Sequence, residues 1–199
     1  MSAPARVRPT QRERREATIA RIVDATIDVL GELGYARTTV TEIGTRAGVS
    51  QGGIFRHFDT RLDVIAAAAI EVTSRQVAAF EHAVADTDGS VRSLLELTRA
   101  ATRAPVNAAW QELLTAARTD SALRDRLAPV VEVLRDRIVE LAAGRSALRA
   151  VPTDLLRPLV LTIVQAFDGE ALARSVLPDP ATDSARLDLF DTMIRSLVE

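Results

Sequence analysis

The sequence predicts an all-α protein, with an N-terminal three-helix helix-turn-helix domain followed by a six-helix body. Three observations carry this prediction. Apolar residues recur at three- and four-residue spacing along most of the 199-residue chain, residues that favour helices dominate the composition, and no segment has the alternating pattern of a strand. Aromatic residues make up only 4% of the chain, so the core must be aliphatic.

The first predicted element is a long helix that follows an arm without regular structure. Residues 1–10 contain two prolines and no periodicity, which is typical of a disordered arm. The apolar stripe that predicts the helix comprises Ile19, Ile22, Val23, Thr26, Leu30 and Leu33. Gly34 is expected to end this helix in the left-handed conformation.

Two short helices joined by a turn are predicted next. Thr39 and Glu42 have the spacing of a capping box, which starts a second helix that Gly48 ends. Ser50 is a suitable N-cap for a third helix over residues 51–58. Two short helices around a glycine-containing turn form the helix-turn-helix pattern, so residues 11–59 are predicted to be one domain.

Six further helices are predicted over residues 60–199, the second domain. Proline, glycine and capping residues divide this part of the chain into segments with helical periodicity. The segments cover residues 60–85, 91–103, 106–118, 121–145, 154–176 and 184–198.

Composition excludes several classes of protein. There are no cysteines and two histidines, and the HExxH, GxSxG and phosphate-loop motifs are missing, so we expect no enzyme activity, metal site or cofactor. No apolar run approaches the roughly 20 residues of a membrane span, so we expect a cytoplasmic protein that does not bind membranes. Residues 1–61 hold 10 arginines and 7 acids, against 15 and 20 in the remainder. Unless this asymmetry is chance, it indicates a DNA-binding head on a body with another task.

Residues 38–68, TTVTEIGTRAGVSQGGIFRHFDTRLDVIAAA, resemble the DNA-binding signature of TetR-type transcriptional regulators. The resemblance is carried by the paired threonines, the Ala-Gly-Val-Ser turn at 47–50, the Phe-Arg-His-Phe run at 55–58 and the Arg-Leu pair at 61–62. It implies a helix-turn-helix that binds operator DNA as a homodimer. Two residues depart from the family pattern, which usually has tyrosine at the position of Phe55 and lysine at that of Arg61.

The head residues expected to contact DNA are Thr39, Thr41, Gln51, Gly52, Gly53, Phe55, Arg56, His57 and Arg61. Gln51 can bond adenine bidentately from the start of the recognition helix, and Arg56 can read guanine or contact phosphate. The two threonine hydroxyls suit a phosphate at a helix start, although capping alone also accounts for Thr39. The resemblance assigns phosphate contacts to His57 and Arg61, while Phe55 is expected to pack against the sugar-phosphate wall.

Adjacent glycines in so short a helix need an explanation, because each costs about 0.8–1 kcal/mol relative to alanine in a helix interior. We interpret Gly52 and Gly53 as the point of closest approach to the groove, where backbone meets the base edges. The alternative is that one of them only relaxes the turn.

In the body, the resemblance implies an inducer pocket among the middle helices and a dimer interface on the last two. The residues expected to bind the ligand are Phe80, Leu94, Trp110, Leu114, Val131, Gln165 and Asp168. Those expected at the dimer interface are Leu159, Ile163, Phe167, Leu187, Phe190 and Ile194. The aliphatic composition favours a hydrophobic inducer. The function that follows is a repressor released from operator DNA by a small molecule. The alternative is a helical small-molecule-binding protein with a vestigial head.

Overall fold

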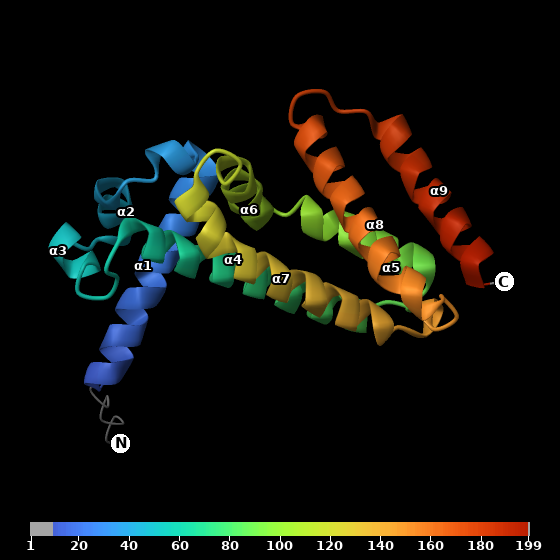
Figure 1. Cartoon of the computed structure of the whole chain (residues 1–199), viewed down its shortest axis with the longest axis horizontal. Helices are drawn as coiled ribbons and strands as arrows, with labels where there is room; N and C mark the ends of the chain where they lie inside the picture. Colours follow the sequence, from blue (N-terminus) through green and yellow to red (C-terminus); the bar gives the residue numbers. More distant parts are fainter. Residues whose placement is uncertain (1–9, 199) are drawn as a thin grey trace, which may run out of the picture.

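The computed structural model describes residues 10–198, so the predicted arm lies, except for its last residue, outside the described residues. Figure 1 shows an elongated bundle with the head helices at one end and α8 and α9 at the other. Between these ends α4 and α7 run side by side. Every regular element within residues 10–198 is helical, which confirms the predicted fold class.

The head contains the three predicted α-helices and one short 3-10 helix. Their bounds are α1 Gln11–Leu33, η1 Tyr35–Arg37, α2 Val40–Ala47 and α3 Gln51–Ile54. A side-chain hydroxyl accepts a backbone N–H at the start of each α-helix, and these caps are Thr10, Thr39 and Ser50. Gly34 takes a positive φ of 81° as predicted, but its ψ of 167° is extended rather than left-handed helical.

The body contains six α-helices close to the predicted ranges. Its elements are α4 Arg61–Ala85, α5 Val91–Thr102, α6 Pro105–Ala116, α7 Ser121–Ala143, η2 Ser146–Leu148, α8 Thr153–Arg174 and α9 Pro180–Val198. The largest difference is the start of α9, which precedes the predicted residue 184. Asp179 accepts the Thr182 N–H at 3.1 Å, and Pro180 supplies the fixed φ that suits a first helical position.

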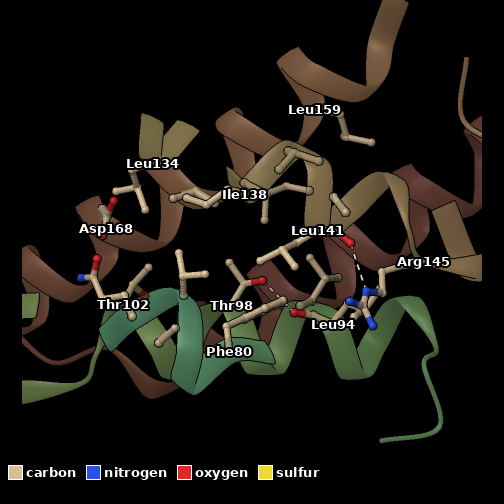
Figure 2. Close-up of a pocket in the computed structure, with 18 of the residues that line it drawn as sticks. Phe80, Leu94, Thr98, Thr102, Leu134, Ile138, Leu141, Arg145, Leu159 and Asp168 are labelled. Carbon is tan, nitrogen blue, oxygen red and sulfur yellow. Dashed lines mark hydrogen bonds between the residues drawn. The ribbon is translucent and has the colours of Figure 1, made fainter. Parts of the chain in front are cut away.

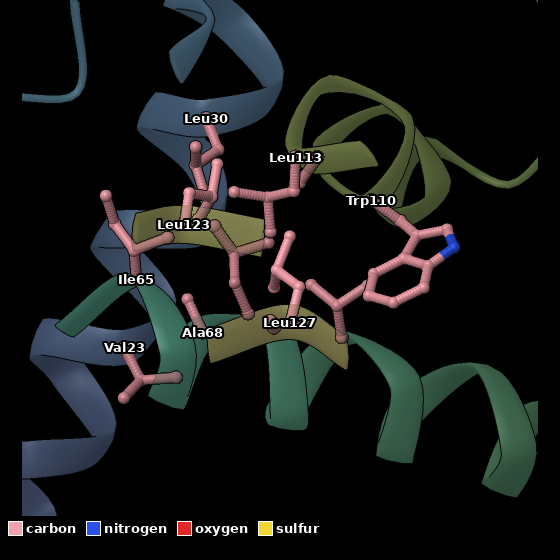
Figure 3. Packing of buried hydrophobic residues seen from close by; sticks show 12 residues of the cluster. Val23, Leu30, Ile65, Ala68, Trp110, Leu113, Leu123 and Leu127 are labelled. Atoms are coloured by element: carbon pink, nitrogen blue, oxygen red, sulfur yellow. The ribbon is translucent and has the colours of Figure 1, made fainter. Parts of the chain in front are cut away.

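Three aliphatic clusters hold the chain together. One joins α1, α2 and α3 of the head to the start of α4, through residues such as Ile22, Ile43 and Ile54. A second joins α1 to α4, α6 and α7, and Figure 3 shows Leu30 and Leu127 packed within it. The third joins α5, α8 and α9. Because α1 belongs to the first two clusters, head and body share a continuous core.

The recognition helix is shorter than predicted. The structure ends α3 at Ile54 and continues as a turn through residues 55–57, whereas the prediction ran to Phe58. Phe58 instead packs against both clusters that contain α1, so the chain must bend toward the core after one helical turn. None of the helices in the described part of the chain combines the length and apolar character needed to cross a bilayer.

Candidate functional site

The turn between α2 and α3 depends on close backbone contact. Gly48 adopts the left-handed conformation with φ 64° and ψ 36°, which ends α2. The Val49 N–H donates to the Gly44 carbonyl at 3.0 Å. A Cβ added at Gly44 would lie 2.7 Å from the Val49 carbonyl oxygen, so no larger residue fits there without moving backbone. This contact fixes the angle at which α3 leaves the turn.

The two glycines of α3 differ in their surroundings. A Cβ at Gly53 would lie 2.7 Å from Val49 Cγ1 and 3.3 Å from Ser50 Oγ, so this position faces the turn. A Cβ at Gly52 would meet nothing within 4 Å, and the residue is exposed. The interpretation that both face the groove is therefore wrong for Gly53, which intrachain packing requires. Close approach to DNA stays a prediction for Gly52.

The predicted polar DNA contacts at the starts of α2 and α3 are exposed. Gln51 Nε2 donates to Thr41 Oγ1 at 2.7 Å, a contact that holds the amide beside the start of α2. Thr39 is exposed, and its Oγ1 accepts the Glu42 N–H at 3.2 Å. The carboxylate of Glu42 does not complete the predicted capping box. The structure thus brings together the Gln51 amide and the Thr41 hydroxyl, and Thr39 caps the helix that contains Thr41.

The turn after α3 adds an aromatic and two basic residues. Phe55 is 48% exposed, and Arg56 is exposed with no ion pair among the described residues. His57 is half-buried, and its Nδ1 is buried without a hydrogen-bond partner in the described structure. A phosphate contact by His57 would therefore have to use Nε2. These three contacts with DNA stay predictions.

Arg61 has a different environment from the one expected. Its Nε donates to the Thr38 carbonyl at 2.6 Å and its Nη2 to the Tyr35 carbonyl at 2.5 Å. The guanidinium carbon lies 4.5 Å from the centre of the Tyr35 ring. The guanidinium was predicted to contact a DNA phosphate, whereas in the structure it binds the carbonyls of η1 and the residue after it. A planar fork can reach two carbonyls and stack on a ring, which a lysine cannot.

Replacing Arg61 with alanine is therefore expected to destabilise the protein by about 1–3 kcal/mol, because two charge-assisted hydrogen bonds are lost. Arg61→Lys should lose most of the same stability, since it keeps the charge without the fork. The salt dependence of DNA binding should change little in either variant. Thermal melting and operator titration at several salt concentrations measure both effects. Unchanged stability in the alanine variant, with a salt slope reduced by about 1, would instead assign Arg61 to a phosphate.

A cavity of about 140 Å³ lies in the body (Figure 2). Residues from α4, α5, α7 and α8 form most of its wall, and α6 and α9 contribute to it. The wall is mainly aliphatic and includes Val77, Phe80, Leu94, Trp110, Leu134, Ile138, Leu141, Leu159 and Ile163. Such a concave apolar space with few polar groups is the kind of site that binds small molecules.

A chain of polar side chains reaches this cavity from α4 through α6 to α8. Gln76 Nε2 donates to Asn107 Oδ1 at 2.7 Å. Asn107 Nδ2 donates to the Thr102 carbonyl at 2.5 Å and to Asp168 Oδ1 at 3.1 Å. Burial raises the pKa of the Asp168 carboxyl, and the hydrogen bond from Asn107 partly opposes that shift. These groups form a polar end of the cavity, across from Arg145 (Figure 2).

Four of the seven residues predicted to bind a ligand line the cavity, namely Phe80, Leu94, Trp110 and Asp168. The other three are corrected. Leu114 is 39% exposed, Gln165 is exposed, and Val131 packs against the cluster of α1, α4, α6 and α7. Sequence reasoning missed Gln76, Asn107 and Arg145, which also line the cavity. Asn107 had a usable signal, because it is a lone amide in the apolar run PVNAAW.

Four of the six residues predicted at the dimer interface are buried in the chain's own interior, and the other two are half-buried. Ile163, Phe167, Leu187 and Ile194 are buried in the cluster of α5, α8 and α9. Leu159 and Phe190 pack against that cluster, and the Phe167 and Phe190 rings meet edge to face at 5.6 Å. The interface assignment is therefore wrong for the four buried residues, because α5 occupies the face that was assigned to a second copy, and it stays a prediction for the half-buried Leu159 and Phe190.

Several large hydrophobic side chains of α8 and α9 are exposed, among polar residues. Seven of the eleven exposed large hydrophobic side chains of the described residues lie on these helices or the loop between them: Leu155, Leu172, Val176, Leu177, Leu189, Met193 and Leu197. Exposed hydrophobic side chains gathered on the two last helices make this surface a candidate interaction site.

Comparison with known proteins agrees with this architecture. The sequence model described as bacterial regulatory proteins, tetR family, matches residues 22–68. The chain is 37% identical over 188 residues to the HTH-type transcriptional regulator Rv2912c of Mycobacterium tuberculosis, covering 93% of this chain and 96% of that protein.

Solved structures have the same fold. A TetR-family transcriptional regulator from Streptomyces coelicolor superposes with a TM-score of 0.61 at 24% identity, over 90% of this chain and 99% of that one. The multidrug binding protein EbrR, in complex with imidazole, superposes with a TM-score of 0.63 at 26% identity, over 94% and 96%. The family and these regulators are transcriptional proteins rather than enzymes. The chain belongs to the TetR family of bacterial transcriptional regulators.

Proposed function

We propose that this regulator is a dimeric repressor that leaves its operator when a small hydrophobic molecule fills the body cavity. The observation that carries the proposal is that α4 contacts the cavity at one end and the head at the other. Gln76, Val77 and Phe80 in its second half line the cavity, and Arg61 at its first residue holds η1 of the head. A ligand that moves the cavity end of α4 would therefore also move Arg61 and the head element that it holds.

Further contacts support transmission from the body to the head. The Tyr35 N–H donates to Glu112 Oε1 of α6 at 2.8 Å, and the Tyr35 hydroxyl donates to Asp120 Oδ2 at 2.6 Å. Asp120 also caps α7, the helix that lies along α4. A shift of α4, α6 or α7 would thus act on η1, which precedes the helix-turn-helix. By linkage, operator DNA must weaken the ligand by the same factor as the ligand weakens DNA.

On the DNA side, the proposal places α3 in the major groove. Gln51 would read a base from its position beside Thr41, and Arg56 would contact a guanine or a phosphate. Thr39 and His57 would contact phosphates, and Phe55 would pack on the sugar-phosphate wall. Because operator DNA is the partner, we place the protein in the cytoplasm.

The exposed face of α8 and α9 supports the dimer. Two copies joined there would carry two heads, which successive major grooves accept at a spacing of about 34–36 Å. A change of a few ångströms in that spacing would be enough to release one head, because both must engage together for tight binding.

A gel-shift titration with DNA from upstream of the protein's own gene tests the proposal. We expect a specific complex that survives excess random competitor DNA, and we expect the protein to lower transcription from that promoter in vitro. Equal affinity for upstream and random DNA would overturn operator binding. Increased transcription would replace repression with activation. Heat-inactivated protein is the control.

A further inference from the structure

We propose that the body cavity binds an amphiphilic monocation, an apolar amine whose ammonium group pairs with Asp168. The inference rests on the proposed function, which makes the cavity a ligand site, and adds the charge of the ligand. Three observations carry it: the environment of the carboxylate, the direction of the polar chain that ends there, and the contrasting environment of Arg145 across the cavity.

Asp168 is a carboxylate without a cationic partner in an apolar wall. It lies in the interior of α8, and within the described part of the chain its side chain accepts one hydrogen bond, from Asn107 to Oδ1. None of the ion pairs among the described residues includes it. An ionised carboxylate in such surroundings is destabilised unless a donor or a cation pairs with it. A ligand that brings a positive charge would supply that partner.

The neighbouring amides cannot supply a donor for the second carboxylate oxygen of Asp168. Asn107 Nδ2 already donates to both the Thr102 carbonyl and Asp168 Oδ1, so its two hydrogens are used. Gln76 donates to Asn107 rather than to the carboxylate, and Gln111 Nε2 donates to the Asp168 backbone carbonyl at 3.4 Å. The amides therefore orient the carboxylate and leave Oδ2 open to a donor from the cavity.

Arg145 could attract an anionic ligand instead, but its guanidinium already donates to a carbonyl at the end of a helix. It lies just beyond the end of α7, and its Nε donates to the Leu141 carbonyl at 3.0 Å. The terminal carbonyls of a helix carry partial negative charge, which stabilises a cation there. Figure 2 shows Arg145 and Asp168 at opposite ends of the group of lining residues.

The aromatic lining also favours a cation. Phe80 and Trp110 both line the cavity, in a chain that has only seven aromatic residues. The face of an aromatic ring is negative and attracts an ammonium group but repels a carboxylate. Trp110 is the one tryptophan of the sequence, so its fluorescence reports on the occupancy of this cavity.

The test uses three probes that share one chain and differ in charge: octylammonium, octanol and octanoate. Titration of the full-length protein, followed by Trp110 fluorescence and calorimetry, should give octylammonium an affinity at least about tenfold above both others. Asp168→Asn should remove this preference and leave octanol binding nearly unchanged. Arg145→Gln and Gln165→Asn should retain the preference. Asp168→Asn should also melt no lower than the original protein, because it removes an unpaired charge.

The outcomes separate this inference from the proposed function. Tightest binding of octanoate, or loss of the preference in Arg145→Gln alone, would overturn the assignment to Asp168. Equal binding of all three probes would overturn the charge preference and leave the cavity as a ligand site. Binding of none of them would overturn the inference together with ligand release. Operator binding, measured on the same preparation, would then show whether the proposed binding to operator DNA is still correct.

Discussion

Replacing Gly53 with leucine is expected to disrupt the helix-turn-helix and abolish operator binding. The first atom of any side chain at Gly53 would lie 2.7 Å from Val49 Cγ1, and valine is rigid at χ1. Overpacking of this kind costs about 1–3 kcal/mol, more than the roughly 0.8 kcal/mol that leucine gains in helix propensity. The variant should therefore melt at a lower temperature and lose specific DNA binding together with its head structure.

Gly52 is the matched control for this prediction. It is the preceding residue of the same helix, and a Cβ added there would meet no atom within 4 Å. Gly52→Leu should leave the stability equal or slightly higher. If Gly52 is the point of closest approach, the same variant should lose more than about 2 kcal/mol of specific operator binding, since a leucine would displace water from base edges it cannot bond. Non-specific binding should persist, because cations facing phosphates supply that term.

Thermal melting and operator titration of both leucine variants measure these effects. A double-mutant cycle that combines Val49→Ala with Gly53→Ala tests whether the contact between these two residues is the cause of the lost stability. Val49→Ala should cost less in the Gly53→Ala background than alone, because it removes the atom that the new Cβ meets. A Gly53→Leu protein as stable as the original, with full operator affinity, would show that the predicted clash is relieved without cost.

The helices could be predicted because their signals are local. Apolar spacing, hydroxyl caps and glycines act within a few residues, and these placed the body helices to within four residues of their observed bounds. The restriction at Gly53, by contrast, depends on a tertiary contact that local signals do not contain. It comes from Val49, which precedes the N-cap Ser50 and folds back over α3 toward Ile54. A propensity argument treats Gly52 and Gly53 alike, because it does not contain that contact.

The two faces of α8 could not be assigned from the sequence, because both are apolar. The same periodicity that places Ile163 and Phe167 on one stripe leaves Leu172 on the opposite side of the helix. Which stripe packs within the chain depends on where α5 lies, and that is set by the connections between helices. The inward role of Arg61 was hidden for a similar reason, since its carbonyl partners lie 23 and 26 positions earlier in the chain.

Introducing charge on the exposed face of α8 and α9 is expected to give a folded monomer with weak operator binding. Leu172 is 56% and Leu189 57% exposed in the single chain, so glutamate at both positions should be tolerated by the fold. In a dimer joined through this face, the new carboxylates would be buried without partners, which is strongly unfavourable. Ile163→Glu, by contrast, should unfold the protein, because Ile163 is 7% exposed within its own chain.

Light scattering after size exclusion, circular dichroism and operator titration together decide this prediction. Val133→Glu is the control, since Val133 on α7 is 71% exposed and lies outside the α8–α9 face. It should remain dimeric. The double variant should keep its helix content and lose roughly 100-fold or more in operator affinity, because one head then binds without the effective concentration that its partner supplies. A double variant that stays dimeric would place the interface elsewhere. A monomer with full affinity would mean that two independently bound chains occupy the operator, which would remove head spacing as the means by which a ligand releases DNA.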